Sequence, residues 1–311
     1  MGRGLSIWFL CLSALLLGFV GAQVNPLAYL LIGILAPLPV LVAGRRSGEW
    51  AALGLALAAA VVLFAPNPVP AAVWQNLGFL NLLAMGVLLV SLQARGMSAP
   101  RAIIFTMVAL SGIAVLIFLG QAFFQGISPQ ELLAQKSAEV MDTVRKVLGD
   151  AGDSPGPLIP GIPSEEVQGL LQRLLPGLMV TNMALVAWLN VVLARQIASR
   201  LKWGGSEPPL YQWTAPEWLI FVLLGAGFLL LVPVTVIHLV GMNLLMVLAV
   251  LYFSQGVAVV ANWFNRLGLP WPLRLIGYPL LFLNPFFFLI ITLGLLDLWL
   301  DFRRLHQPKD A

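Results

Sequence analysis

The fold of this chain is decided by the stretch that begins LYFSQGVAVV at residues 251–260, turns at LPWP at residues 269–272 and ends LGLLDLWLDFRR at residues 293–304. Most of its side chains are apolar over lengths that suit helices. An α-helix rises 1.5 Å per residue, so about 20 residues cross the ~30 Å hydrocarbon core of a bilayer. The stretch therefore predicts membrane-crossing helices, and its glutamine and aspartates need partners inside the protein.

Composition indicates the same class of protein. Of the 311 residues, 60% are hydrophobic and 10% are charged, against roughly 25% charged in a soluble domain. The net charge of +4 is small and the basic residues are scattered, so no nucleic-acid partner is expected, and the lipid bilayer is the expected surroundings. Cys11 is the only cysteine, which excludes an internal disulfide and a cysteine metal cage.

Apolar runs of membrane-crossing length recur along the whole chain. They predict an all-α, polytopic transmembrane helical bundle with about nine membrane segments. The segments are Leu5–Gln23, Leu27–Ala43, Trp50–Ala65, Ala72–Gln93, Ala102–Phe124, Leu174–Ile197, Pro216–Val236, Leu239–Trp263 and Leu273–Leu300.

The charges between these runs predict the orientation. Short gaps that carry Lys or Arg alternate with short gaps that carry none, and in the long gap at residues 125–173 acidic residues outnumber basic ones. Basic loops stay in the cytoplasm, so the N-terminus is expected there. The first run also has the features of a secretory signal that ends at Val20-Gly21-Ala22. We expect it to be retained as the first span, and cleavage is the alternative.

The last run contains Asn284-Pro285 in its middle. Proline removes an intrahelical hydrogen bond and disfavours helix at the residue before it. We expect a segment broken at Asn284-Pro285 that goes in and back and returns the tail to the cytoplasm. The alternative is one crossing that leaves Arg303, Arg304 and Lys309 outside, against the positive-inside rule.

These runs divide the chain into four parts. They are an N-terminal membrane half at residues 1–124, an extracytoplasmic loop at 125–172, a C-terminal membrane half at 173–304 and a cytoplasmic tail at 305–311. In the loop, Ser128-Pro129-Gln130-Glu131 has the pattern of a capping box and begins an amphipathic helix of about 20 residues. Ser164 is expected to cap a second helix that runs through Pro176 as far as Lys202.

Amide side chains within the apolar runs are the candidate ligand-binding residues, namely Asn81, Asn182, Asn190, Gln255 and Asn262. In a membrane such groups either line a cavity or form hydrogen bonds between helices. Both interpretations stay open.

Several kinds of site have no counterpart in the sequence. It contains no glycine-rich loop followed by lysine that would bind ATP, no serine–histidine–acid set and no metal-ligand spacing. No charged residue lies near the middle of a run, so the carboxylate relay of a proton-coupled pump is not expected either. We expect a protein that is not an enzyme, with no cofactor and no metal.

Two further groups of residues are expected to serve packing or partner docking. Ala14, Gly18 and Ala22 form a ridge of small residues at four-residue spacing, which lets helix backbones approach closely. Near the end of the last run, Asp301 is expected to pair with Arg304. Asp297 then faces the protein and is expected to pair with Arg266 or Arg274, or else to reach headgroup water.

The stretch at 251–304, together with Ala36-Pro37-Leu38-Pro39-Val40 and Arg45-Arg46-Ser47-Gly48, resembles the YybS family of bacterial integral membrane proteins. The resemblance covers most of the chain and implies a multi-pass protein of the bacterial inner membrane. Through the YybS pattern, the ridge at Ala14 and Gly18 is distantly similar to the docking helix of the S-components of energy-coupling-factor transporters. That similarity implies another membrane subunit or an ATPase as a partner.

Two functions are therefore expected from the sequence. The first is a membrane transport subunit that binds a small or lipid-like molecule and lacks its own energy source. The alternative is a membrane scaffold that contacts cell-envelope partners.

Overall fold

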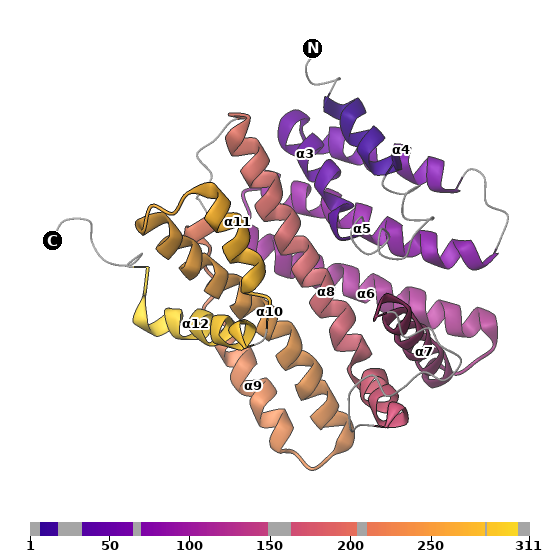
Figure 1. Ribbon diagram of the computed structural model, residues 1–311. Helices are drawn as coiled ribbons and strands as arrows, with labels where there is room; N and C mark the ends of the chain where they lie inside the picture. The colour runs from indigo at the N-terminus through magenta and orange to yellow at the C-terminus, as the bar shows by residue number, and fades with distance from the viewer. Residues whose placement is uncertain are drawn as a thin grey trace. The chain divides into compact units, whose positions relative to one another are not determined.

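The computed structural model describes residues 7–17, 33–64, 70–148, 163–203, 210–283 and 285–303. Within these ranges all the regular elements are helices (Figure 1), which confirms the all-α prediction. The chain forms two compact units, Met1–Met179 with Leu189–Gly204, and Val180–Trp188 with Gly205–Ala311. These units are defined by contacts between residues, whereas the four parts expected from the sequence are defined by the predicted membrane segments and loops.

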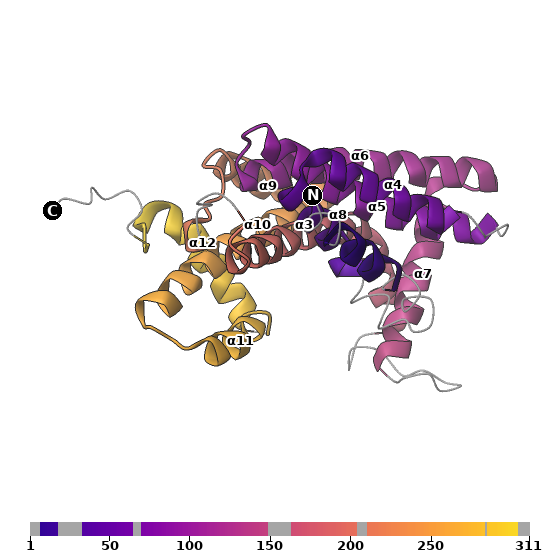
Figure 2. The same ribbon diagram turned by 90° about the horizontal axis from the view of Figure 1, so that it is seen from above.

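Unit 1 is a set of helices in which α5 has the most helical neighbours. Its elements are the helix Ile7–Leu17, α3 (Pro37–Ser47), α4 (Glu49–Phe64), α5 (Pro70–Ala94), α6 (Ala99–Gln125), α7 (Pro129–Leu148) and most of α8 (Ser164–Arg200). α3 packs on α4 and α5, and α5 packs on α4 and α6. α4, α5 and α6 run alongside one another, and α7 runs across their direction (Figures 1 and 2).

The capping box that begins α7 is confirmed. The backbone N–H and the hydroxyl of Ser128 donate to Glu131 Oε2 at 2.8 and 2.9 Å, and Glu131 N–H donates to Ser128 Oγ at 3.2 Å. These bonds satisfy N–H groups that a helix start leaves without intrahelical partners. Leu132, Ser137 and Met141 are buried, so α7 packs on unit 1 through one face.

α8 is one continuous helix of 37 residues with Pro176 inside it, about 55 Å long, so only its middle fits within the hydrocarbon. Ser164 does not cap it: Pro163 holds the cap position, and the Ser164 hydroxyl accepts a hydrogen bond from Arg145 Nη2 at 3.2 Å. The helix ends at Arg200, because Lys202 has φ +52° and turns the chain back.

Unit 2 is built on α10. It contains η1 (Leu210–Gln212), α9 (Leu219–Leu231), α10 (Thr235–Arg266), α11 (Trp271–Leu280) and α12 (Phe286–Leu300). α10 packs on α9, α12 and η1. α9 is shorter than the predicted span Pro216–Val236, because prolines lie just outside both of its ends.

Four helical segments are long and apolar enough to cross a membrane: Leu77–Ala94, Ala99–Gln125, Ser164–Arg200 and Thr235–Arg266. Shorter apolar helices are Ile7–Leu17, Glu49–Val62, Leu219–Leu231 and Phe286–Leu300. The described chain therefore agrees with a helical membrane bundle. Of the predicted span Leu27–Ala43, residues 27–32 lie outside the described ranges.

The last predicted segment is broken, as expected. α11 ends at Leu280 and α12 begins at Phe286 after Pro285, while Asn284 itself lies outside the described residues. Phe282 and Phe287 pack on Phe253, each with ring centroids 4.9 Å away, near the middle of α10. Arg303 C=O accepts a hydrogen bond from Arg266 Nη2 at 3.0 Å. The chain thus leaves the Arg266 end of α10, turns level with Phe253 and returns to the same end.

Candidate functional site

The site lies where α10 and α12 cross. A Cβ on Gly256 would collide with the carbonyl oxygen of Ile290, and one on Gly294 would collide with the carbonyl oxygen of Tyr252. The two backbones are therefore in direct contact, which small residues at membrane-helix crossings permit. This crossing places Gln255 of α10 beside Asp297 of α12.

Gln255 joins three parts of unit 2. Its side chain is 1% exposed. Oε1 accepts a hydrogen bond from Ala215 N–H at 3.0 Å, and Nε2 donates to Asp297 Oδ2 at 3.1 Å. Gln255 therefore holds α12 and the segment before α9 against α10. Of the two interpretations of the amide residues, this is hydrogen bonding between helices.

Asp297 and Arg303 form an ion pair whose side chains are each 2% exposed. Arg303 Nη2 and Nε donate to Asp297 Oδ2 at 2.5 and 3.0 Å. Arg303 Nη1 donates to the carbonyl oxygens of Tyr211 and Trp213 at 2.8 and 2.5 Å. Four hydrogen bonds thus hold the guanidinium, which offsets much of its cost of leaving water.

A reversal of the chain after α12 brings Arg303 back to Asp297. Asp301 ends the helix with φ +40°, and its N–H donates to Asp297 C=O at 3.2 Å. Among residues other than glycine, aspartate and asparagine adopt this left-handed conformation most readily. Arg266 holds the reversed turn through its bond to Arg303 C=O.

The expected partners of Asp297 were wrong. Arg266 donates to Arg303 C=O, and Arg274 donates to Leu269 C=O and Phe264 C=O at 2.7 and 3.3 Å. Asp297 does not reach headgroup water either, because it is 5% exposed. The backbone reversal at Asp301 makes Arg303, six residues along the chain, the residue that reaches it.

Several buried polar atoms of unit 2 have no hydrogen bond within the described chain. Asp297 Oδ2 accepts three hydrogen bonds, whereas Oδ1 accepts none from any described residue. In the same unit, the Tyr252 hydroxyl, Trp213 Nε1 and Asn262 Nδ2 are buried and likewise lack hydrogen bonds to the described chain. The carboxylate oxygen is a hydrogen-bond acceptor, whereas the hydroxyl, indole and amide N–H groups can donate.

The structure distributes the predicted amide residues between the two units. Asn81 of α5 and Asn190 of α8 belong to unit 1, and Asn190 is fully buried with Nδ2 donating to Ile34 C=O at 2.6 Å. Asn182 is an exposed residue of α8, because eight residues leave it about 80° around the helix from Asn190. Gln255 and Asn262 lie in unit 2. Ligand binding by these five residues stays a prediction.

The predicted docking residues are described only in part. Ala14 is exposed on the helix Ile7–Leu17, and Gly18, Ala22 and Arg304 lie outside the described residues. The expected pairing of Asp301 with Arg304 therefore stays a prediction. No group of three or more His, Cys, Asp or Glu residues that could hold a metal ion occurs in the described ranges.

Sequence reasoning missed Arg303, Tyr252 and the segment 211–215. Arg303 was considered only as one of the basic residues that determine on which side the last segment ends, although it is the next cation after Asp297 in the sequence. The position of Arg303 in the sequence could therefore have suggested this ion pair. The hydrogen bonds to the carbonyl groups of Tyr211 and Trp213 could not be predicted, because backbone acceptors are the same for every residue type.

A family model described as "Predicted membrane protein (DUF2232)" matches residues 11–298. No curated protein and no solved structure matches the chain.

Proposed function

This chain belongs to DUF2232, a family of predicted membrane proteins, and from that premise we propose that it is a transport subunit that binds a small polar or amphiphilic molecule in unit 2. The YybS-like resemblance of the sequence fits this family, whereas no comparison shows a similarity to S-components. The role is one of binding, not of catalysis.

The observation that supports this proposal is Asp297 Oδ1, a buried carboxylate oxygen that accepts no hydrogen bond from the described residues. Ionisable residues within membrane segments are costly, and they mark binding or transport sites by default. A buried polar group without a hydrogen bond costs about 1–3 kcal/mol. A ligand that carries an amine or hydroxyl donor for Oδ1 and an acceptor for the Tyr252 hydroxyl or Trp213 Nε1 would recover that cost.

The proposal also assigns the energy source to a partner. The sequence contains no phosphate-binding loop, so a separate ATPase or membrane energy-coupling subunit supplies the energy. The protein resides in the bacterial inner membrane with its N-terminus in the cytoplasm. The segregation of charge in unit 1 supports this orientation, because its basic loops are those at residues 45–48, 94–101 and 200–203.

Tyr252→Phe tests ligand binding without threatening the fold. The Tyr252 hydroxyl is buried and bonds to no described residue, so its removal should leave stability unchanged or raise it. If the hydroxyl contacts a ligand, the amount of small molecule extracted from purified protein falls at least severalfold, as measured by mass spectrometry of the extract.

Thr106→Val in α6 is the matched control. Thr106 is 0% exposed, its hydroxyl is likewise unsatisfied within the described chain, and it lies in unit 1. It should leave the extracted molecule unchanged. A Tyr252→Phe variant that retains the same molecules in the same amounts as wild type and Thr106→Val would remove the binding proposal.

Affinity purification in mild detergent tests the partner. A stoichiometric ATPase that dissociates at high salt or on substitution of the chain's cytoplasmic loops supports the transport role. Purification with cell-envelope proteins and no ATPase contradicts it.

A membrane scaffold is the second candidate. The observation that favours it is α7, an amphipathic helix fixed at its start by the Ser128–Glu131 capping box, which keeps Val140 and Val144 37% and 40% exposed. In this case Val140→Ser with Val144→Ser abolishes function and Tyr252→Phe leaves it unchanged. The transport proposal predicts the opposite pattern.

A further inference from the structure

One end of unit 1 carries a basic rim, which consists of Arg45, Arg46, Arg95, Arg101, Arg200 and Lys202. These residues lie at the end of α3, between α5 and α6, in the first turn of α6 and at the end of α8. Among the described residues of these loops, Glu49 is the only acidic one. The rim is therefore a concentration of positive charge at a single end of the helices.

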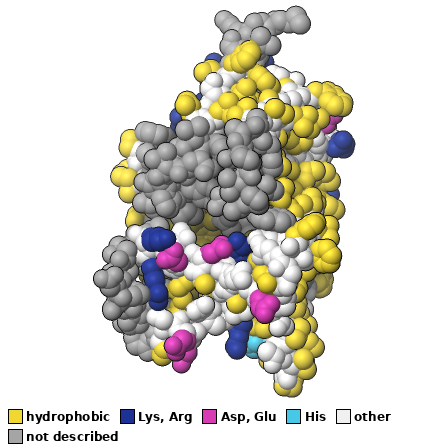
Figure 3. Space-filling view, turned by 90° about the vertical axis from the view of Figure 1, so that its right-hand side faces the viewer, with side chains coloured by type: hydrophobic (Ala, Val, Ile, Leu, Met, Phe, Trp, Pro, Cys, Tyr) yellow, Lys and Arg dark blue, Asp and Glu magenta, His cyan; other side chains and the backbone are white. Residues whose placement is uncertain are grey.

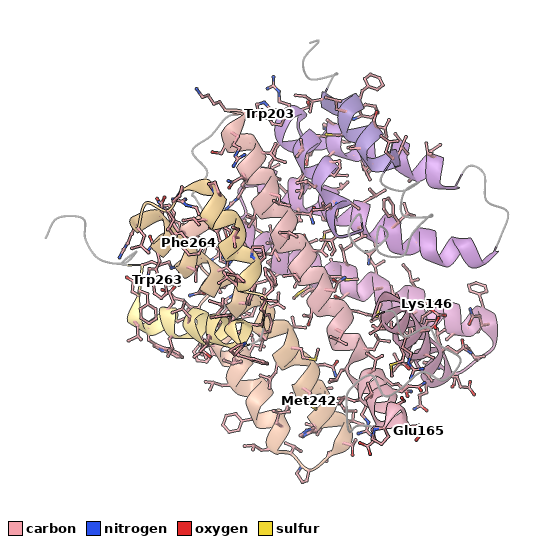
Figure 4. The ribbon with its side chains drawn as sticks, viewed as in Figure 1. Lys146, Glu165, Trp203, Met242, Trp263 and Phe264 are labelled. Atoms are coloured by element: carbon pink, nitrogen blue, oxygen red, sulfur yellow. The ribbon has the colours of Figure 1, made fainter. Side chains whose placement is uncertain are left out.

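Contacts between side chains hold the rim together. Arg45 Nη2 donates to Gln93 Oε1 at 2.7 Å, which joins the ends of α3 and α5. The Arg46 guanidinium lies 5.8 Å from the ring centroid of Trp203, which joins the ends of α3 and α8. Trp203 reaches this position because Lys202 has φ +52° and Trp203 N–H donates to Ala198 C=O at 2.9 Å. Trp203 and Glu165 lie at opposite ends of α8 (Figure 4).

The opposite end of unit 1 differs in its charges. In α7, Lys136 pairs with Glu139 at 2.8 Å and Lys146 pairs with Asp142 at 2.6 Å. On the face shown in Figure 3, acidic and basic side chains are interspersed. Lys136 and Lys146 thus pair with carboxylates of the same helix, whereas the described loops of the rim contain one carboxylate beside six basic residues.

The position of the rim favours contact with lipid headgroups. It is formed at the ends of Leu77–Ala94, Ala99–Gln125 and Ser164–Arg200, which are long and apolar enough to cross a membrane. Trp50, which follows Glu49 at this end, is 78% exposed, and exposed tryptophans favour the membrane interface. The anion that such a rim meets first is a lipid phosphate.

We propose that the basic rim binds the phosphate groups of anionic phospholipids in the leaflet that it faces. Arginine guanidinium groups bind phosphate oxygens in pairs of hydrogen bonds, and the Trp203 ring holds that of Arg46 in place. Each basic residue near an anionic surface strengthens binding by about fivefold. This surface belongs to unit 1 and is independent of the ligand proposed for unit 2.

The test is native mass spectrometry of the full chain released from nanodiscs of mixed phosphatidylglycerol and phosphatidylcholine. The variant carries Arg95→Gln and Arg101→Gln, two exposed rim residues. The control carries Lys136→Gln and Lys146→Gln, which removes the same charge from the opposite end. We expect preferential retention of phosphatidylglycerol to fall about twentyfold in the rim variant and to stay within about twofold of wild type in the control.

Two results would overturn the proposal. The first is equal retention of phosphatidylglycerol by the rim variant and the control. The second is displacement of the retained lipid by soluble glycerol phosphate in modest excess, because the rim would then be a site for a free phosphate compound. Folding of both variants is checked by their thermal unfolding in detergent.

Discussion

Asp297 and Arg303 are both removed from water, and the balance between their desolvation and their attraction determines what each substitution does. Two buried charges recover their desolvation only through good geometry and additional hydrogen bonds. Here the additional bonds come from Gln255 Nε2 and from the carbonyl groups of Tyr211 and Trp213. The pair therefore joins α10, α12 and the segment before α9 into one unit.

Asp297→Asn should destabilise the protein strongly. It leaves the Arg303 guanidinium buried without its counter-ion, and breaking a buried pair in this way costs about 3–5 kcal/mol. Thermal unfolding in detergent, followed by tryptophan fluorescence, should show a clear loss of stability. Asp301→Asn is the matched control, because asparagine also tolerates φ +40° and Asp301 is half-buried. Equal stability of the two variants would contradict the pairing.

Replacing both charges should recover only part of this loss. In Asp297→Leu with Arg303→Met the uncompensated charge is gone, but the carbonyl groups of Tyr211 and Trp213 lose their donor. We expect a stability between those of Asp297→Asn and wild type in the same unfolding measurement. If the double variant were as stable as wild type, the two carbonyl groups would have to accept hydrogen bonds from water in place of Arg303.

The identity of the partner of Asp297 could not be predicted from helical periodicity. Arg303 reaches Asp297 only because the helix ends and Asp301 adopts a left-handed conformation. If the helix continued without a break, helical periodicity would instead pair Asp301 with Arg304. The bonds from Arg303 to Tyr211 and Trp213 span about 90 residues, and no local pattern encodes them.

At the scale of elements, the close contact between α10 and α12 predicts that Gly256 and Gly294 cannot be replaced without loss of stability. Gly256→Ala or Gly294→Ala places a Cβ against backbone atoms of the facing helix, and backbone cannot move aside as a flexible side chain can. Each substitution should lower the unfolding temperature markedly. Gly112→Ala and Gly120→Ala in α6 are the controls, because no atom lies within 4 Å of their added Cβ; they should be neutral or stabilising by up to about 1 kcal/mol.

The start of α7 should depend on pH. Hydrogen bonds from the backbone N–H and then the hydroxyl of Ser128 lower the pKa of the Glu131 carboxyl below its ordinary value. Because the folded pKa is the lower one, the stabilisation is complete above the unfolded pKa of about 4.3 and is lost as the pH falls through the folded value.

Hydrogen exchange of the first α7 amides measures this dependence. Their protection should decrease below about pH 4 in wild type. In Ser128→Ala, which lacks the hydroxyl part of the cap and loses about 1 kcal/mol of helix stability, protection should be lower at neutral pH and less dependent on pH. Protection that stays constant down to pH 3 would contradict the role of the Glu131 carboxylate.

Elements with strong local signals could be predicted from the sequence. The capping box at Ser128 fixed the start of α7, and Asn284-Pro285 indicated the break before α12. The five amide residues were harder, because an amide that lines a cavity and one that bonds to a neighbouring helix look the same in a sequence. Asn190 and Gln255 differ from the exposed Asn182 only through what packs against them.

At the scale of the whole molecule, the direction of the chain through the membrane follows from contacts at the end of α10. Arg266 Nη2 donates to Arg303 C=O, and the rings of Trp263 and Phe302 lie 6.4 Å apart. Trp263 and Phe264 lie near one end of α10, and Met242 lies toward the other (Figure 4). The C-terminal ends of α10 and α12 therefore lie together. Because α11 and α12, with 10 and 15 residues, are about 15 and 22 Å long and neither crosses ~30 Å, we expect both ends on the same side of the membrane.

Cysteine labelling tests this sidedness. In a Cys11→Ser background, Leu267→Cys and Lys309→Cys should react with a membrane-impermeant maleimide from the same side, because Leu267 is 73% exposed just after α10 and Lys309 follows Arg303 in the chain. Within unit 1, Lys202→Cys in the basic rim and Glu139→Cys in α7 should react from opposite sides of the membrane. Because basic loops stay in the cytoplasm, the first three should be labelled in inverted vesicles and the last in whole cells. Labelling of Lys309→Cys from the outside, with Leu267→Cys labelled from the inside, would mean that the last segment crosses the membrane once, and the contact between Arg266 and Arg303 could not then form.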